Sequence, residues 1–118
     1  MRLLLNFSVA TLVIYCGLVL LLYLFQRNLL YHPSTKSSKP AENGISEMAL
    51  VEVVTSDGLN LEAWFKKPEG GKQTILYLHG NAGNLSHRSL KIKKYLDAGF
   101  GILLLGYRGY GSNSGNPS

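Results

Sequence analysis

The chain has 118 residues, enough for one small domain, and a formal net charge of +5. Arg2 and Arg27 flank a long apolar run, and from residue 28 onward 10 basic and 7 acidic residues leave 10 − 7 = +3, which gives no reason to expect nucleic-acid binding. The lone Cys16 excludes an internal disulfide or a cysteine metal site, and the 3 histidines share no ligand spacing, so we expect neither a metal nor a cofactor.

Residues 3–25 carry no charge and are long enough to cross a membrane as a helix. Such a helix spans about 35 Å at 1.5 Å per residue, against ~30 Å for the hydrocarbon core. No small-x-small cleavage site follows, so the pattern predicts an uncleaved signal-anchor in the lipid bilayer over residues 1–27, not a cleaved signal peptide. The flanking basic residues lean only slightly toward a cytoplasmic domain and do not decide on which side of the membrane it lies.

Residues 28–47 form a polar connector rich in Pro, Ser and Lys, which we expect to be extended. A Ser-Asp-Gly turn at Asp57 then joins a β-branched run to the alternating run at residues 59–65, and this pattern predicts a β-hairpin. Asp57 is better explained as a turn residue than as a catalytic acid. Trp64 interrupts the alternation, and we expect it near the edge of the sheet.

A βαβ unit is predicted after the hairpin. Residues 74–78 are apolar throughout, which is typical of a central parallel strand covered on both faces. Residues 85–98 have the apolar spacing of a helix that ends at Gly99, and residues 101–105 form a second apolar strand. The crossover should be right-handed. His87 falls on the solvent face of this helix, so we do not expect it to act as a base.

The loop between the first of these strands and the helix reads His-Gly-Asn-Ala-Gly-Asn (residues 79–84). The first N–H groups of a helix lack partners and favour an anion, here either a phosphate or the oxyanion of an acyl transfer. A Walker loop needs Lys and Ser or Thr after its last glycine, and a dinucleotide loop needs three spaced glycines. Neither fits. The His-Gly opening after a strand is typical of a loop that donates to an oxyanion.

The second strand leads into another glycine-rich loop, residues 106–115. Ser112 and Ser114 both lack the flanking glycines of a Gly-x-Ser-x-Gly nucleophile elbow, so we interpret them as loop serines. Arg108 could pair with a carboxylate or brace the loop, and bracing is the role that we favour.

Four motifs together resemble one family. They are Gln-x-x-Leu-x-Tyr-His-Pro at residues 26–33, the Ser-Asp-Gly hairpin, the loop at residues 79–84, and Tyr-Arg-Gly-Tyr-Gly at residues 107–111. The chain thereby resembles the membrane-anchored α/β-hydrolases of the bud-emergence type, which are serine hydrolases. The resemblance covers nearly the whole chain. It implies an α/β fold, the N-terminal part of an α/β-hydrolase, with a β-hairpin and one βαβ unit (residues 48–118, a truncated hydrolase domain) behind a single transmembrane helix.

The resemblance also implies which residues form the site. The backbone N–H groups of Asn81 and Ala82 would be the oxyanion donors. Gly106 is a departure, because relatives often carry an acid there. The family's nucleophile, acid and base would lie beyond Ser118, so we expect no catalytic side chain here. The remaining loop-motif residues are His79, Gly80, Gly83, Asn84, Tyr107, Arg108, Gly109 and Gly111.

From this resemblance we expect the N-terminal portion, or a fragment, of an esterase-like or thioesterase-like acyl hydrolase. It would act on an acyl ester or thioester only if completed and would be inactive alone, which leaves open whether this chain is itself an enzyme. The alternative is a non-enzymatic membrane protein that binds a partner through an open sheet edge, such as a chain that carries the missing C-terminal half. A third reading is an anion-binding module. Residues 34–118 alone should be marginally stable.

Overall fold

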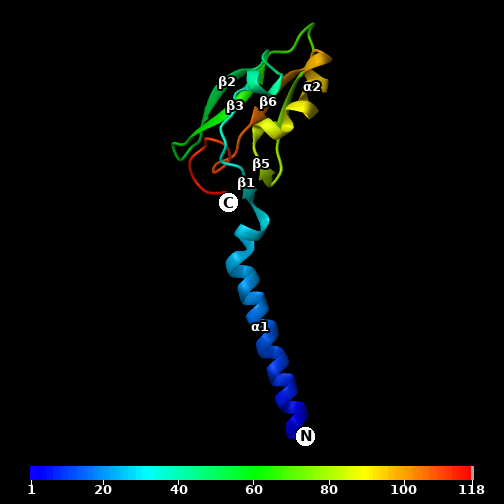
Figure 1. The fold of residues 1–118 in the computed structure, drawn as a ribbon, viewed down its shortest axis with the longest axis vertical. Coiled ribbons are helices and arrows are strands. Elements are labelled where there is room, and N and C mark those ends of the chain that lie inside the picture. The colour runs from blue at the N-terminus through cyan, green and yellow to red at the C-terminus, as the bar shows by residue number, and fades with distance from the viewer. Residues whose placement is uncertain (118) are drawn as a thin grey trace. The chain divides into compact units, whose positions relative to one another are not determined.

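The structure, a computed structural model, describes residues 1–117 and divides into two units, Met1–Leu30 and Tyr31–Ser118 (Figure 1). The first unit is one helix and the second is a small α/β domain. The elements are α1 (Arg2–Leu30), β1 (His32–Pro33), η1 (Pro40–Asn43), β2 (Ala49–Val54), β3 (Asn60–Lys66), β4 (Thr74–Leu78), β5 (Ala82–Gly83), η2 (Leu85–Arg88), α2 (Ser89–Asp97) and β6 (Gly101–Leu105), where η denotes a 3-10 turn.

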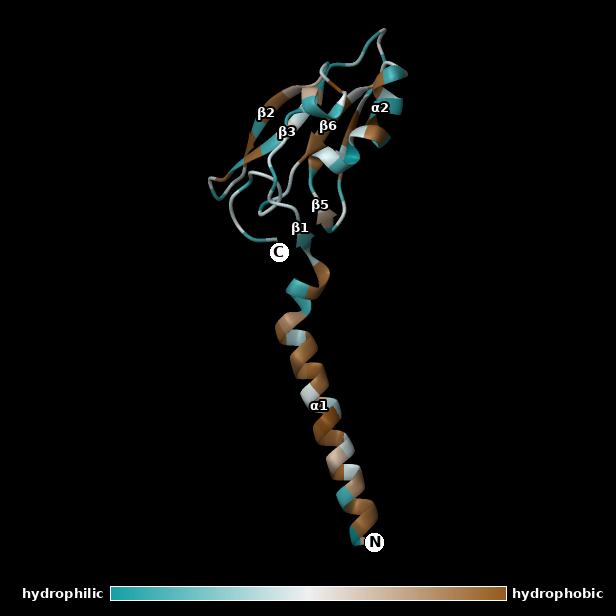
Figure 2. Cartoon of the chain, in the orientation of Figure 1, coloured by the Kyte–Doolittle hydropathy of each residue, from teal (hydrophilic) through white to brown (hydrophobic). Residues whose placement is uncertain are grey.

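Helix α1 is apolar along most of its length, as Figure 2 shows, and is long enough to cross a membrane. It continues to Leu30, beyond the end that we expected at residue 27. The helix stops shortly before Pro33, because a proline disfavours helical backbone in the residue that precedes it.

The domain is built on a four-stranded sheet in the order β2-β3-β6-β4. The hairpin β2–β3 is antiparallel, β3 pairs antiparallel with β6, and β6 pairs parallel with β4. The predicted hairpin and the predicted βαβ unit (β4, α2 and β6) are therefore both present. Because β4 and β6 run in the same direction, the loops that follow them leave from the same edge of the sheet.

The core lies on one face of the sheet, beneath α2 and η1. Trp64 is fully buried there, packed with Ile102 and Leu104 from β6. Our expectation that Trp64 lies near the sheet edge is wrong. Strand β3 is interior, with Trp64 paired to Leu50 on one side and to Leu104 on the other, so its ring points into the core.

The connector also contributes to this core, which its polar composition did not predict. Ile45 is fully buried and Met48 is nearly so. The 3-10 turn η1 is held by Glu42, whose carboxylate accepts the backbone N–H of Lys39 at 3.1 Å. Residues 28–47 are therefore not uniformly extended.

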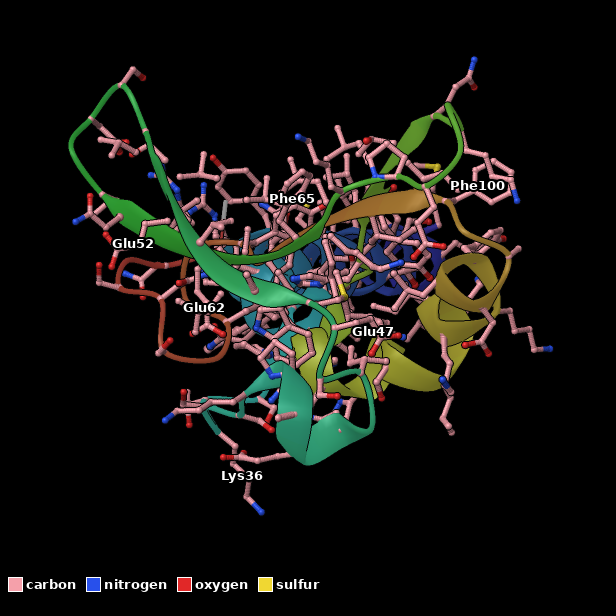
Figure 3. The ribbon with its side chains drawn as sticks, turned by 90° about the horizontal axis from the view of Figure 1, so that it is seen from above. Lys36, Glu47, Glu52, Glu62, Phe65 and Phe100 are labelled. Carbon is pink, nitrogen blue, oxygen red and sulfur yellow. The ribbon has the colours of Figure 1, made fainter. Side chains whose placement is uncertain are left out.

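The opposite face of the sheet is apolar, and within the described part of the domain (residues 31–117) no helix covers it. Figure 3 shows Phe65 on the side away from η1 and α2. Leu76 and Leu78 of β4 also lie on this face and are 57% and 53% exposed. The apolar run at residues 74–78 is typical of a strand covered on both faces, but β4 is the last strand of the described sheet and α2 covers only one side of it, which agrees with the open sheet edge that we expected from the resemblance. The residues that the register places on this face are Val51, Val53, Phe65, Leu76, Leu78, Leu103 and Leu105, together with Leu61 and Ala63, which their neighbours bury, and we call it the bare apolar face.

The helix expected over residues 85–98 is divided into η2 and α2. Polar side chains cause the division. The Asn84 carboxamide oxygen accepts the Ser86 N–H at 3.1 Å, and the Ser89 hydroxyl donates to the Ser86 carbonyl at 2.8 Å. Such side-chain bonds stabilise turns and caps in competition with a continuous helix.

Candidate functional site

Two loops meet at the edge of the sheet where β4 and β6 end. In doubly wound α/β sheets, ligands bind outside the carboxyl ends of parallel strands. A hollow of about 390 Å³ opens here, and three tyrosines are among the residues that line it. It is lined by Tyr31, Leu61, His79, Gly80, Asn81, Tyr107, Arg108, Tyr110 and Pro117.

His79 joins the two loops. Its Nδ1 lies 2.8 Å from the Gly80 carbonyl oxygen, and its Nε2 accepts the Tyr107 N–H at 3.3 Å. These partners require the neutral tautomer with the proton on Nδ1. Burial lowers the pKa of His79, and the positive charge of Arg88 lowers it further, against an opposing effect of the Gly80 carbonyl. Because both ring nitrogens are bonded to backbone groups, His79 connects the two loops structurally.

Asn81 has its carbonyl fixed and its N–H available. The carbonyl oxygen accepts the His32 N–H at 2.9 Å and the Tyr110 hydroxyl at 2.7 Å. Within residues 1–117, which the structure describes, the Asn81 N–H donates to no protein acceptor. Ala82 is held from both sides, since it pairs with His32 and its carbonyl accepts Nη2 of Arg88 at 2.6 Å. The loop is therefore rigidly placed and retains a backbone donor.

The donor lies in the loop and not at the start of a helix, contrary to our expectation. The first turn after the loop is η2, and the Asn84 side chain already accepts the Ser86 N–H. Helix α2 begins only at Ser89. The helix N-terminus is thus separated from the loop by a capped turn.

A contribution that the sequence did not predict comes from the connector. Strand β1 pairs in parallel with β5, and the Ser34 N–H donates to the Gly83 carbonyl at 2.8 Å. The Asn84 carboxamide donates to the Lys36 carbonyl at 2.8 Å, from a side chain that is 4% exposed. The Tyr-His-Pro motif hinted at extended backbone here, but a two-residue strand has no periodicity from which pairing could be read.

Arg108 braces the second loop against the hairpin. Its guanidinium donates to both carboxylate oxygens of Asp57, at 2.9 and 3.1 Å. The Thr55 hydroxyl also donates to Asp57, at 2.5 Å. The Arg108 bond, followed by the Thr55 bond, lowers the pKa of Asp57 to about 2. Both charged side chains are therefore engaged with each other, and Asp57 serves as a structural residue of the turn.

Gly106 occupies a space that has no room for a side chain. Its N–H donates to the Glu62 carbonyl at 3.0 Å, and a Cβ atom would lie 2.8 Å from that oxygen and 2.7 Å from Nδ2 of Asn113. Asn113 fills the adjacent space, accepting the Glu62 N–H at 2.7 Å and donating to the Tyr107 carbonyl at 3.1 Å. Asn113 thus takes the position that an acid at residue 106 would need.

The rest of the second loop is held by backbone hydrogen bonds within the loop and to the connector. The Gly109 N–H donates to the carbonyls of Asn113 and Ser114, at 3.2 and 3.1 Å, and the Gly111 N–H donates to the carbonyl of Ser34, at 2.8 Å. The Ser112 hydroxyl donates to Glu62 at 2.6 Å, which agrees with its interpretation as a loop serine. His87 is exposed, as predicted.

Comparison with known proteins identifies the family. The chain is 35% identical over 108 residues to the alpha/beta hydrolase domain-containing protein WAV2 of Arabidopsis thaliana, a match that covers 85% of this chain and 35% of WAV2. It is 32% identical over 108 residues to the protein bem46 of Schizosaccharomyces pombe, covering 82% and 36% of the two chains. The chain belongs to the membrane-anchored α/β-hydrolases of the bud-emergence type.

A third relative of this bud-emergence-type chain is the membrane protein YNL320W of Saccharomyces cerevisiae, 35% identical over 103 residues, with 82% of this chain and 36% of the relative covered. The chain spans about a third of the length of these curated relatives. No family model matches it.

The structural comparison agrees with the α/β-hydrolase fold class. The esterase Pf2001 of Pyrococcus furiosus superposes with a TM-score of 0.54 at 21% identity, over 73% of this chain and 34% of the esterase. The α/β fold predicted from the sequence is therefore confirmed as part of an α/β-hydrolase fold. An apolar N-terminal helix in a chain related to a membrane protein agrees with membrane anchoring.

Proposed function

We propose that this chain supplies the oxyanion loop of a membrane-anchored serine hydrolase that cleaves acyl esters or thioesters. The observation that carries the proposal is the available N–H of Asn81, on a braced loop at the carboxyl end of β4 that lines an aromatic hollow. Relatives named as an α/β-hydrolase domain protein and a structural neighbour named as an esterase support the same reaction class.

In this mechanism the carbonyl oxygen of the acyl group lies against Asn81 and becomes an oxyanion when a nucleophile attacks. The N–H of Asn81, together with that of Ala82, donates to the developing charge. A pre-positioned donor of this kind is worth about 10²–10³ in kcat. The nucleophile, the acid and the general base would come from residues outside this sequence, which contains no Gly-x-Ser-x-Gly.

The first test uses membranes from the source organism. An antibody to residues 36–47 would be combined with a fluorophosphonate probe, which reacts with activated serines. We expect a band well above the 13.0 kDa of this chain that carries both the epitope and the label. A band at 13.0 kDa alone, without label, would contradict the proposal.

A second test addresses the donor itself in the complete enzyme. Asn81→Pro removes the N–H, whereas Asn81→Ala keeps it and serves as the control. We expect Asn81→Pro to lower kcat about 10²–10³-fold relative to Asn81→Ala, because the lost bond forms only in the transition state. Equal rates for the two variants would exclude Asn81 as an oxyanion donor.

A second candidate function is partner binding through β4. This strand ends the described sheet, and its Leu76 and Leu78 are more than half exposed. Unpaired strand edges and bare apolar faces favour association. This function predicts that native complexes contain the 13.0 kDa chain bound to a second protein, and the same antibody would recover both after mild solubilisation.

A further inference from the structure

The connector after the membrane-spanning helix is bonded to both loops of the site. The N–H groups of His32 and Ser34 donate to the loop that carries Asn81, at 2.9 and 2.8 Å. The Ser34 carbonyl accepts the N–H of Gly111, at 2.8 Å, from the second loop. A single strand of connector thus lies between the two loops and is hydrogen-bonded to each.

Two hydrogen bonds, one of them from the connector, hold the peptide between Asn81 and Ala82. The carbonyl of Asn81 is held by the His32 N–H on one side and by the Tyr110 hydroxyl on the other. The Asn81 carbonyl lies in the same peptide plane as the Ala82 N–H, so fixing it orients that second proposed donor and restrains the backbone of Asn81, to which the plane is joined. The bond that the connector makes is thus one of two that orient the peptide between Asn81 and Ala82.

The Asn84 side chain bonds to the connector at a second point, near the end of residues 32–36. Its Nδ2 donates to the Lys36 carbonyl at 2.8 Å, while its Oδ1 accepts the N–H of Ser86 at 3.1 Å and the hydroxyl of the same residue at 2.6 Å. The side chain is 4% exposed, so these bonds are shielded from water. One carboxamide therefore joins the connector to the turn that follows the loop.

We infer that residues 32–36 are a positioning element for the oxyanion loop, so that the segment that follows the membrane anchor also sets the geometry of the peptide between Asn81 and Ala82. The inference rests on the proposed function for its catalytic meaning. Its structural content, that the connector orders both loops, can be tested without any activity.

The variants separate the backbone and side-chain bonds. His32→Pro removes the N–H that donates to Asn81, and His32→Ala keeps it. Asn84→Asp retains the acceptor for Ser86 but loses the donor to Lys36. Its matched control is Asn43→Asp, because Asn43 donates to Ser38 and Lys39 inside the connector and makes the same change of charge away from the loops.

The structural measurement is amide hydrogen exchange on the full chain in phospholipid nanodiscs. We expect the amides of Ser34 and Gly111 to exchange about two- to tenfold faster in His32→Pro and Asn84→Asp than in their controls. Each variant removes one net hydrogen bond between residues 32–36 and the loops. Amides in β3 and α2 should be unchanged. Equal exchange in variant and control, or acceleration that is uniform over β3 and α2, would overturn the inference.

The catalytic measurement uses the complete enzyme. We expect His32→Pro to lower kcat at least threefold relative to His32→Ala with KM unchanged, since the oxyanion bond acts in the transition state. A rise in KM with constant kcat would overturn the positioning role. Absence of activity in the unsubstituted enzyme would contradict the proposed function instead, and the exchange measurement would still decide the inference.

Discussion

At the scale of single residues, the two loops of the site are held in place by side chains that each make specific hydrogen bonds. His79 illustrates this, because its position in the motif invites the interpretation of a catalytic base. Its Nδ1 and Nε2 are both bonded to backbone groups, and its ring lies 4.3 Å from that of Tyr107 and 4.9 Å from that of Tyr110. A base needs a free nitrogen directed at its substrate, and His79 has none.

Protonation of His79 should destabilise the fold. Its folded pKa lies below the usual 6.5, so the unfolded chain binds the proton first as the pH falls. Stability is therefore complete above about pH 6.5 and decreases as the pH falls toward the folded pKa. We expect the Tm of the complete enzyme to fall between about pH 7 and about pH 5.5, and to fall less in His79→Gln, which does not titrate. The same decrease in both proteins would contradict this assignment.

The Asp57–Arg108 pair makes a second prediction at this scale. A lysine offers a point charge in place of the two-pronged guanidinium. In Arg108→Lys, the pKa of Asp57 should rise from about 2 toward its usual 3.8. A ¹³C NMR titration of the carboxyl group would measure it, with Arg88→Lys as the control. Because a lowered acid pKa stabilises the fold above the unfolded value, Arg108→Lys should also lose less stability as the pH falls below about 4. An unchanged pKa would exclude Arg108 as its cause.

At the scale of elements, the sequence predicted the parts whose formation is local. The apolar runs of β4 and β6 and the Asp57 turn each carry their own pattern. Trp64 was misplaced because the interior position of β3 depends on pairing with β6, far along the chain. The pairing of β1 with β5 was missed for the same reason, since non-local contacts leave no periodicity. The helix after the loop was divided by the side-chain bonds of Asn84, which a count of apolar spacing does not detect.

Packing around Gly106 gives a prediction for the loop after β6. A Cβ atom there would meet the Glu62 carbonyl oxygen at 2.8 Å, and that oxygen belongs to the β3 backbone and cannot move freely. We expect Gly106→Ala to lower the free energy of unfolding by about 1–3 kcal/mol, the usual cost of overpacking. Gly80→Ala is the control, because no atom lies within 4 Å of its Cβ position. Urea unfolding of the complete enzyme would compare them, and equal midpoints would show that β3 shifts to accommodate the methyl group without loss of stability.

At the scale of the whole molecule, one face of the sheet is covered by α2 and η1, and the other is the bare apolar face. The core under α2 and η1 is closed, whereas Leu76 and Leu78 remain more than half exposed on the opposite face. Exposed apolar patches of this kind mark surfaces that associate. The resemblance predicted an open sheet edge, because the motifs of this sequence account for only part of the family's fold.

The bare face predicts how the domain behaves when it is produced without its helix. We expect residues 31–118 to self-associate and to unfold without a cooperative transition. Leu76→Lys combined with Leu78→Lys should reduce the association measured by analytical ultracentrifugation. Leu90→Lys is the control, because Leu90 is 82% exposed on α2, outside the bare face. A monomeric segment with a sharp thermal transition would contradict this account.

The pairing of β1 with β5 has a consequence for the order of events during synthesis. Ser34 and its partner Asn84 are separated by 50 residues. At about 5–20 residues per second, a ribosome needs several seconds to deliver the second strand after the first. The anchor emerges before either strand, so it can enter the membrane while β1 still waits for its partner. We therefore expect the loop at residues 79–84 to close onto a segment whose preceding helix is already in the bilayer, which would make membrane insertion an early step in building the proposed site.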